Sequence, residues 1–265
     1  MASKSRSLDS SLTITLRVWR ALILRESESR LFASRVSWLW VFLEPVFHVG
    51  YLMFLFTSIE VKKVGQLDTA IWLMVGLQGY FIFRKTGDGV AGAPSSNRGL
   101  FAYRQVKTAD TLIARALLEG FMWAVSTLCM IVVVNVWGHP FVPDDPLALI
   151  GAYFGLWLNG IGFGMIVSTI TALVKEGKLL LKVVMRPMYM ISGVIFPLST
   201  LPVEWREVLM WNPVANAIET ARHALSRHYY PVPETDSTYV FTSALVLLAF
   251  GLALQARFED RVAEQ

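Results

Sequence analysis

The chain has one cysteine among its 265 residues and few charged residues. Because Cys129 lies alone in an apolar run, the sequence excludes a disulfide framework and a thiolate metal site. Charged residues make up 17% of the chain, whereas soluble domains have about 25%. Hydrophobic residues make up 54%, and mean hydropathy is +0.50. This composition indicates an integral membrane protein.

Several motifs of chemistry are also missing. Without a G-x-x-x-x-G-K-[ST] loop, the chain is not expected to bind ATP by that motif. It has no H-E-x-x-H pattern, its four histidines are scattered, and nothing signals a hydrolytic triad. Residues 1–35 contain no apolar core long enough for a cleavable signal peptide. We therefore expect no catalytic residue, no metal and no cofactor on this chain, and we attribute its pI near 9.2 to membrane topology rather than to nucleic-acid binding.

Six apolar segments approach the length of about 20 residues that crosses roughly 30 Å of hydrocarbon. The fifth carries Lys182 and Arg186 near its start. The predicted fold is an all-α polytopic membrane protein that forms one transmembrane domain over residues 1–265. The predicted spans lie at about 38–58, 70–86, 115–137, 147–174, 179–198 and 238–256.

The distribution of basic residues predicts the orientation. With both termini in the cytoplasm, the cytoplasmic segments hold 18 Lys and Arg, and the external segments 59–69, 138–146 and 199–237 hold five. Lys and Arg concentrate in cytoplasmic loops. We therefore expect both termini to be cytoplasmic.

Two cytoplasmic elements flank the first spans. Residues 10–31 place Leu12, Leu16, Trp19 and Ile23 on one face, which predicts an amphipathic interfacial helix. Residues 98–110 form a second piece of mixed charge, after a segment at 87–99 that its glycines predict to be loose. The pairs Gly151/Gly155 and Gly160/Gly164 predict close helix packing.

A re-entrant hairpin is predicted at about 200–227, between the fifth and last spans. Pro213 fits a first helical turn, and Asn212 fits an N-cap. Glu219 and Arg222 are three residues apart and are able to pair. Because backbone groups at membrane depth need partners, such an element favours a gate or pore over a plain anchor.

Short motifs along the whole chain carry a family resemblance. They are Leu24-Arg25-Glu26, the run from Trp38 through Glu44-Pro45, Ile191-Ser192-Gly193, and Asn212-Pro213 followed by Glu219 and Arg222. In this order they resemble the permease subunits of type-2 ABC exporters, and most closely the inner-membrane permeases that export capsular polysaccharide in Gram-negative bacteria.

The resemblance implies a bacterial inner-membrane location and a lipid-linked polysaccharide as substrate. It implies a homodimer with two copies of a separate ATPase subunit that binds ATP and Mg. It also implies a periplasmic co-polymerase-like partner and an outer-membrane exporter. O-antigen, teichoic acid and small-molecule ABC permeases share the plan and remain alternatives. A lipid-modifying membrane enzyme is the alternative of another class, but it should show clustered His, Asp or Ser, and this sequence does not. A secondary transporter should show mid-span ionisable residues and repeat symmetry, and neither is visible.

Several residues are candidates for the substrate entrance. Lys182 and Arg186 share a helix face at the predicted cytoplasmic mouth, and Arg35 precedes the first span. They are interpreted as an anion site for phosphate or acidic sugar, or alternatively as snorkelling topology signals. Glu44 and Pro45 either shape the gate or form a plain proline kink with a carboxylate.

The remaining candidates form three groups. An aromatic path for sugar rings, or alternatively an interfacial belt, is predicted. A contact with the ATPase subunit and an exit hairpin, or alternatively a stabilised external cap, complete the set. The path comprises Trp38, Trp40, Phe47, Tyr51, Tyr80 and Phe83; the ATPase contact Arg25, Glu26, Glu28 and Arg104; and the hairpin Asn212, Pro213, Glu219 and Arg222.

Overall fold

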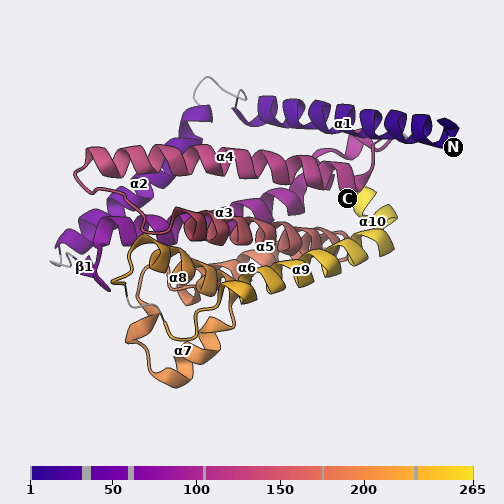
Figure 1. Cartoon of the computed structure of the whole chain (residues 1–265). Coiled ribbons are helices and arrows are strands. Elements are labelled where there is room, and N and C mark those ends of the chain that lie inside the picture. The colour runs from indigo at the N-terminus through magenta and orange to yellow at the C-terminus, as the bar shows by residue number, and fades with distance from the viewer. Residues whose placement is uncertain are drawn as a thin grey trace.

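The structure, a computed structural model, describes residues 2–31, 37–58, 63–103, 106–174, 176–229 and 232–264. It is an elongated bundle of helices with one short β-hairpin (Figure 1). Its elements are α1 (Ala2–Leu31), α2 (Ser37–Ser58), β1 (Lys63–Val64), β2 (Leu67–Asp68), α3 (Thr69–Ser96), η1 (Arg98–Leu100), α4 (Thr108–Val136), α5 (Pro146–Leu173), α6 (Gly177–Ile191), η2 (Leu198–Thr200), α7 (Val203–Met210), α8 (Pro213–Leu225), α9 (Ser237–Arg257) and α10 (Glu259–Ala263).

Within the described residues, three helices are long and apolar enough to cross a membrane: α4, α5 and α9. They correspond to the third, fourth and sixth predicted spans. Among the described residues of α2, Val46–Phe56 form an apolar stretch that is shorter than a full span. The chain is thus a helical membrane protein with several spans, and the count of six stays a prediction.

The fifth predicted span is shorter than expected. Helix α6 has 15 residues and ends at Ile191, not at 198. The chain turns at Gly193, whose φ of +65° is a left-handed conformation. A Cβ atom there would lie 2.7 Å from Leu198 Cγ, so a side chain would also collide with η2.

The predicted loose segment at 87–99 is wrong, because α3 continues to Ser96. Gly87 and Gly89 of this segment lie in close contacts with α5 and α4, whereas Gly92 and Gly99 face open space. The glycines of α5 also serve packing. A Cβ on Gly160 of α5 would lie 2.7 Å from the carbonyl oxygen of Phe83, and one on Gly164 would lie 2.7 Å from that of Gly87. A Cβ on Gly155 would lie 2.6 Å from Val240 Cγ1 of α9, whereas Gly151 faces open space. Close backbone approach thus holds α3 and α9 against α5.

The all-α prediction is wrong in one detail, since β1 and β2 pair as an antiparallel hairpin. Gly65 and Gln66 form its turn, and both have positive φ.

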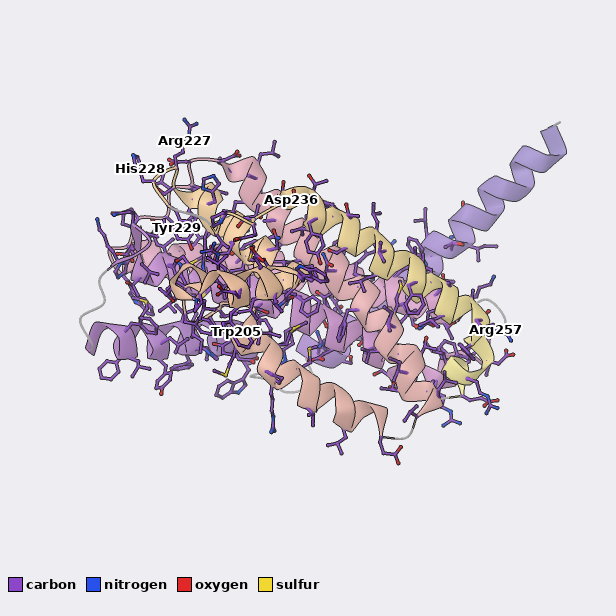
Figure 2. All side chains as sticks on the ribbon, turned by 90° about the horizontal axis from the view of Figure 1, so that it is seen from below. Trp205, Arg227, His228, Tyr229, Asp236 and Arg257 are labelled. Carbon is purple, nitrogen blue, oxygen red and sulfur yellow. The ribbon has the colours of Figure 1, made fainter. Side chains whose placement is uncertain are left out.

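The predicted external segments meet at one end of the bundle. His139 Nδ1 lies 2.9 Å from Asp68 Oδ1, and the backbone N–H of Arg227 donates to Asp144 Oδ2 at 2.8 Å. Figure 2 shows Arg227, His228 and Tyr229 at this end and Arg257 at the opposite one. Both chain termini lie at the Arg257 end, beside α1 and α10 (Figure 1). This arrangement groups the loops as the basic residues predicted, without assigning either end to a compartment.

Candidate functional site

One face of α2 carries exposed aromatic side chains. Trp40, Phe47 and Tyr51 are 63–64% exposed, and spacings of seven and four residues place them on one face of the helix. They border a hollow that Glu44 and His48 also line. We call these three residues the α2 aromatic face (Trp40, Phe47 and Tyr51); all three belong to the predicted aromatic path.

The other predicted path residues lie elsewhere. Tyr80 and Phe83 of α3 are 0% and 2% exposed, and so neither reaches the protein surface of this chain. The Tyr80 hydroxyl donates to the carbonyl oxygen of Met185 at 2.9 Å, and Phe83 packs on Phe163. The side chain of Trp38 lies outside the described residues.

Contacts from α3 and α6 hold α2 in place. The Lys85 ammonium donates to both carboxylate oxygens of Glu44 at 2.8 Å. His48 Nε2 lies 3.3 Å from the Tyr189 hydroxyl. Glu44 is thus a half-exposed partner in an ion pair with Lys85. Helix α2 continues through position 45.

The predicted entrance cations are only partly described. Arg186 is exposed on α6. Lys182 is one turn earlier on the same helix, but its side chain lies outside the described residues, as does the whole of Arg35. The structure therefore places Arg186 alone at the surface and does not show whether the three residues meet.

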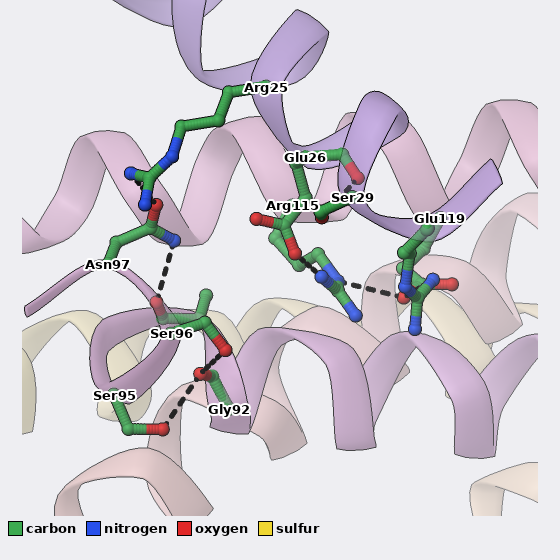
Figure 3. A network of polar contacts seen from close by, with 11 residues as sticks. Arg25, Glu26, Ser29, Gly92, Ser95, Ser96, Asn97, Arg115 and Glu119 are labelled. Carbon is green, nitrogen blue, oxygen red and sulfur yellow. Dashed lines mark hydrogen bonds and ion pairs between the residues drawn. The ribbon is translucent and has the colours of Figure 1, made fainter. Parts of the chain in front are cut away.

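A polar network joins α1 to α4 and to the end of α3 (Figure 3). Arg115 pairs with Glu26 of α1, and its Nε donates to Glu119 at 2.9 Å. Arg30 pairs with the same Glu119 oxygen at 2.6 Å. Glu119 is 3% exposed. A buried carboxylate needs such partners, so the network fixes the position of α1.

Two further bonds tie α1 to the predicted second cytoplasmic piece and to the residue just before it. Trp19 Nε1 donates to Asp110 Oδ1 at 2.8 Å, and Arg25 donates to Asn97 at 3.2 Å. Arg25 and Glu28 are exposed, whereas Glu26 is half-buried against Arg115. Of the predicted ATPase-contact residues, these two remain at the surface, and Arg104 lies outside the described residues.

The hairpin residues form a buried cluster around Arg222, which is 0% exposed. Its guanidinium donates to the carbonyl oxygens of Gly193 and Val194 at 2.9 and 3.1 Å and to Glu219 at 2.9 Å. It also lies over the ring of Trp72, 3.6 Å from the centroid. Helix α8 is therefore fastened to the turn that follows α6.

Neighbouring groups complete this cluster. The Tyr229 hydroxyl donates to Glu219 Oε2 at 2.9 Å, and burial and that carboxylate raise its pKa, which keeps it a neutral donor. Asn212 caps α8 by accepting from Val214 N at 3.0 Å, and it donates to Ser192 Oγ at 2.9 Å. Pro213 begins the helix. The predicted pair Glu219–Arg222 exists, but inside the protein rather than at an open rim.

Sequence reasoning missed Lys85, Tyr189, Arg115 and Glu119. The first two join different helices, so no local spacing reveals them. The i, i+4 spacing of Arg115 and Glu119 is a usable signal for an ion pair. No spacing in the sequence reveals that residues of α1 pair with these two side chains. Among the described residues, no group of three His, Cys, Asp or Glu is arranged to hold a metal ion.

Comparisons with known proteins fit this architecture. The family model of the ABC-2 type transporter matches residues 17–225. The chain is 33% identical to the polysialic acid transport protein KpsM of Escherichia coli, over 91% of this chain and 93% of that protein. It is 26% identical, over 96% of both chains, to the capsule polysaccharide export inner-membrane proteins BexB of Haemophilus influenzae and CtrC of Neisseria meningitidis serogroup B. The match extends over most of the helical bundle, and the chain therefore belongs to the ABC-2 type transporter family.

Proposed function

We propose that this chain is the permease subunit of an ATP-driven exporter that moves lipid-linked capsular polysaccharide across the bacterial inner membrane. The names of KpsM, BexB and CtrC support this substrate class. The observation that carries the proposal is the α2 aromatic face. Aromatic rings pack on the apolar faces of sugars while their hydroxyl groups stay hydrated.

The path forms between two copies of the chain. In a homodimer, the two α2 aromatic faces would line a conduit that neither copy completes alone. Opening would separate α2 from α6, because His48 and Tyr189 join these helices by one hydrogen bond. Exposed Arg186, together with Lys182 and Arg35, would receive the phosphate or acidic sugars at the cytoplasmic mouth.

ATP hydrolysis takes place on a separate subunit, present in two copies for two permeases. Its contact surface includes the exposed Arg25 and Glu28 on α1. The α1–α4 network would then carry the movement of α1 into the bundle. A periplasmic co-polymerase-like protein and an outer-membrane exporter would take the polymer further.

The role of the α2 aromatic face is tested by replacing one exposed phenylalanine on this face and one exposed phenylalanine elsewhere. We expect Phe47→Ala to lower surface polysaccharide several-fold in a strain that depends on this permease, because the ring would be lost from the path. Phe250→Ala on α9 is the matched control, since Phe250 is also exposed, at 55% against 63% for Phe47. Surface polysaccharide is measured by immunoblot, with membrane abundance of each variant as reference. Equal export by both variants would remove the α2 aromatic face from the path.

A further inference from the structure

A second pocket lies where α1, α2, α3 and α4 meet. It measures about 210 Å³. Two cations, Arg30 and Lys85, and two carboxylates, Glu44 and Glu119, line it. They are paired across it, Arg30 with Glu119 at 2.6 Å and Lys85 with Glu44 at 2.8 Å. Its charged lining is therefore balanced, with both signs presented to the same space.

These side chains keep unused hydrogen-bonding capacity. A lysine ammonium has three donors and an arginine guanidinium five. Lys85 gives two contacts to Glu44, and the ion pair of Arg30 uses one nitrogen. A ligand with one anionic and one cationic group would satisfy both kinds of side chain. A purely anionic ligand would be attracted by the two cations of the pocket but repelled by its two carboxylates.

Ser126 supplies a second, independent sign of a ligand. It lines the same pocket and is 4% exposed. Its hydroxyl has no hydrogen-bond partner among the described residues. Buried polar groups are normally hydrogen-bonded, and an exception calls for an absent partner. A ligand in the pocket would supply the partner that the described residues do not give this hydroxyl.

An apolar groove adjoins the same helix. It measures about 650 Å³ and lies between α3, α4 and α5, with a lining that is almost wholly apolar. Trp123, which packs on Phe81, forms a wall of both the pocket and the groove. The groove continues along α4 as far as Ile131. Since α4 is long and apolar enough to cross the membrane, the groove lies at the depth of lipid chains.

We propose that the pocket binds the head group of a zwitterionic aminophospholipid, with one acyl chain in the groove. The phosphate lies at Arg30 and Lys85, and the ammonium lies at the carboxylates of Glu44 and Glu119. The Ser126 hydroxyl donates to a glycerol ester oxygen. On α4 the groove is lined from Leu117 to Ile131, so it runs beside the pocket residues Glu119 to Ser126, with Trp123 as the wall that both share. This site shares Glu44 with the hollow beside the α2 aromatic face, but its ligand is a membrane lipid and not the polysaccharide.

Native mass spectrometry of the purified full chain tests the site. The probes are dioleoyl phosphatidylethanolamine, dioleoyl phosphatidylglycerol and the chain-free O-phosphoethanolamine, at equal concentrations. We expect phosphatidylethanolamine to be retained about tenfold more than phosphatidylglycerol, the ratio that one charge-assisted contact supplies. Equal or greater retention of phosphatidylglycerol would overturn the zwitterion assignment. Displacement of the lipid by O-phosphoethanolamine at the same concentration would overturn the role of the groove.

Matched variants locate the binding. Lys85→Gln should lower retention about tenfold, since it removes a charged donor, and Ser126→Ala should lower it several-fold. The controls are Arg84→Gln, whose side chain is 43% exposed against 38% for Lys85, and Ser168→Ala, another buried hydroxyl without a partner among the described residues. We expect both controls to retain lipid as the parent does. Equal losses in variants and controls, or no loss in either, would overturn the site.

Discussion

Arg222 places a permanent charge in the middle of the packed helices. Its two terminal nitrogens donate to two backbone carbonyls and one carboxylate, and the group lies over the face of Trp72, whereas Nε has no hydrogen-bond partner among the described residues. Gly76 makes room for it, because a Cβ atom on Gly76 would collide with the guanidinium. The charge thus joins α8, α3 and the turn after α6 at a single point, which suits a hairpin that must keep its place.

Removal of this charge should be costly. We predict that Arg222→Met destabilises the protein by about 3–5 kcal/mol, because it leaves the Glu219 carboxylate buried and unpaired. The double variant Glu219→Gln/Arg222→Met should regain much of this loss. Thermal unfolding in detergent, followed by fluorescence-detected size exclusion, measures both. Arg227→Gln, at an exposed arginine two residues beyond α8, is the control. A single variant as stable as the double would contradict the coupling.

A second ion pair makes a pH-dependent contribution. Two hydrogen bonds of 3.0 Å from Arg206 of α7 reach Glu234, and these bonds lower the pKa of that carboxyl. A lowered folded-state pKa stabilises the protein above the ordinary carboxyl pKa of about 4.3, and the contribution is lost as pH falls through the lower folded value. The pair is therefore intact at neutral pH.

We predict that Glu234→Gln lowers stability at pH 7 by about 1 kcal/mol or less, the range for partly exposed pairs. The difference from the parent should shrink as pH falls from 5 towards 3, because the parent then loses the same carboxylate. Unfolding midpoints across that interval measure it. Glu204→Gln changes an exposed carboxyl of α7 and should show neither effect. A constant difference at all pH values would exclude the ionised pair as its cause.

At the level of elements, helix α1 and the start of α4 behave as one unit. Trp19 and Glu26 of α1 reach Asp110 and Arg115 of α4, and Arg25 reaches Asn97 just after α3. The two cytoplasmic elements predicted from the sequence are therefore bonded to each other. A push on either would move both.

We predict that Arg115→Gln loosens α1 from the bundle, because Glu26 and buried Glu119 would lose their shared cation. Hydrogen exchange in residues 20–31 should rise, while exchange in α9 stays unchanged. Arg17→Gln, at an exposed position on the same helix, is the control. Unchanged protection of α1 in Arg115→Gln would show that apolar packing alone holds it.

The sequence predicted helices well where one local signal dominates. A long apolar run without charge predicted α5 to within a residue, 147–174 against the observed Pro146–Leu173. It failed at 87–96, since glycine is a breaker by local propensity, whereas here Gly87 accommodates Gly160 and Phe163 of α5. It also ran α6 past Ile191, because the turn at Gly193 is fixed by Leu198 and Arg222, which lie further along the chain. Tertiary contacts decided both cases.

The candidate site likewise has features that the sequence predicted and features that depend on tertiary packing. The motifs Ile191-Ser192-Gly193 and Asn212 through Arg222 are brought together by hydrogen bonds between Asn212 and Ser192 and between Arg222 and Gly193. Aromatic content, rather than any spacing, put Trp40, Phe47 and Tyr51 among the predicted path residues, and the structure shows that these three are exposed. Burial of Tyr80 and Phe83 depends on how α3 packs against α5 and α6, and no pattern within α3 reports that packing.

At the scale of the whole molecule, the two ends of the bundle differ in charge and in the chain segments that form them. One end gathers the β-hairpin, the loop before α5 and the residues after α8, through contacts such as His139–Asp68 and Arg227–Asp144. The other gathers α1, α10 and both termini (Figure 1). Because basic residues concentrate in the segments of the second end, the positive-inside rule predicts that this end faces the cytoplasm.

Cysteine labelling of intact spheroplasts tests that orientation. In a Cys129→Ser background, which removes the single native cysteine, a membrane-impermeant maleimide should label Arg227→Cys, since Arg227 lies at the predicted external end (Figure 2). Arg257→Cys, at the opposite end and likewise exposed, should react only after the membrane is opened. Labelling of Arg257→Cys alone would invert the protein and place α1 outside, where no ATP-hydrolysing subunit could reach it. Equal labelling of both positions in sealed cells would contradict a bundle that spans the membrane between these two ends.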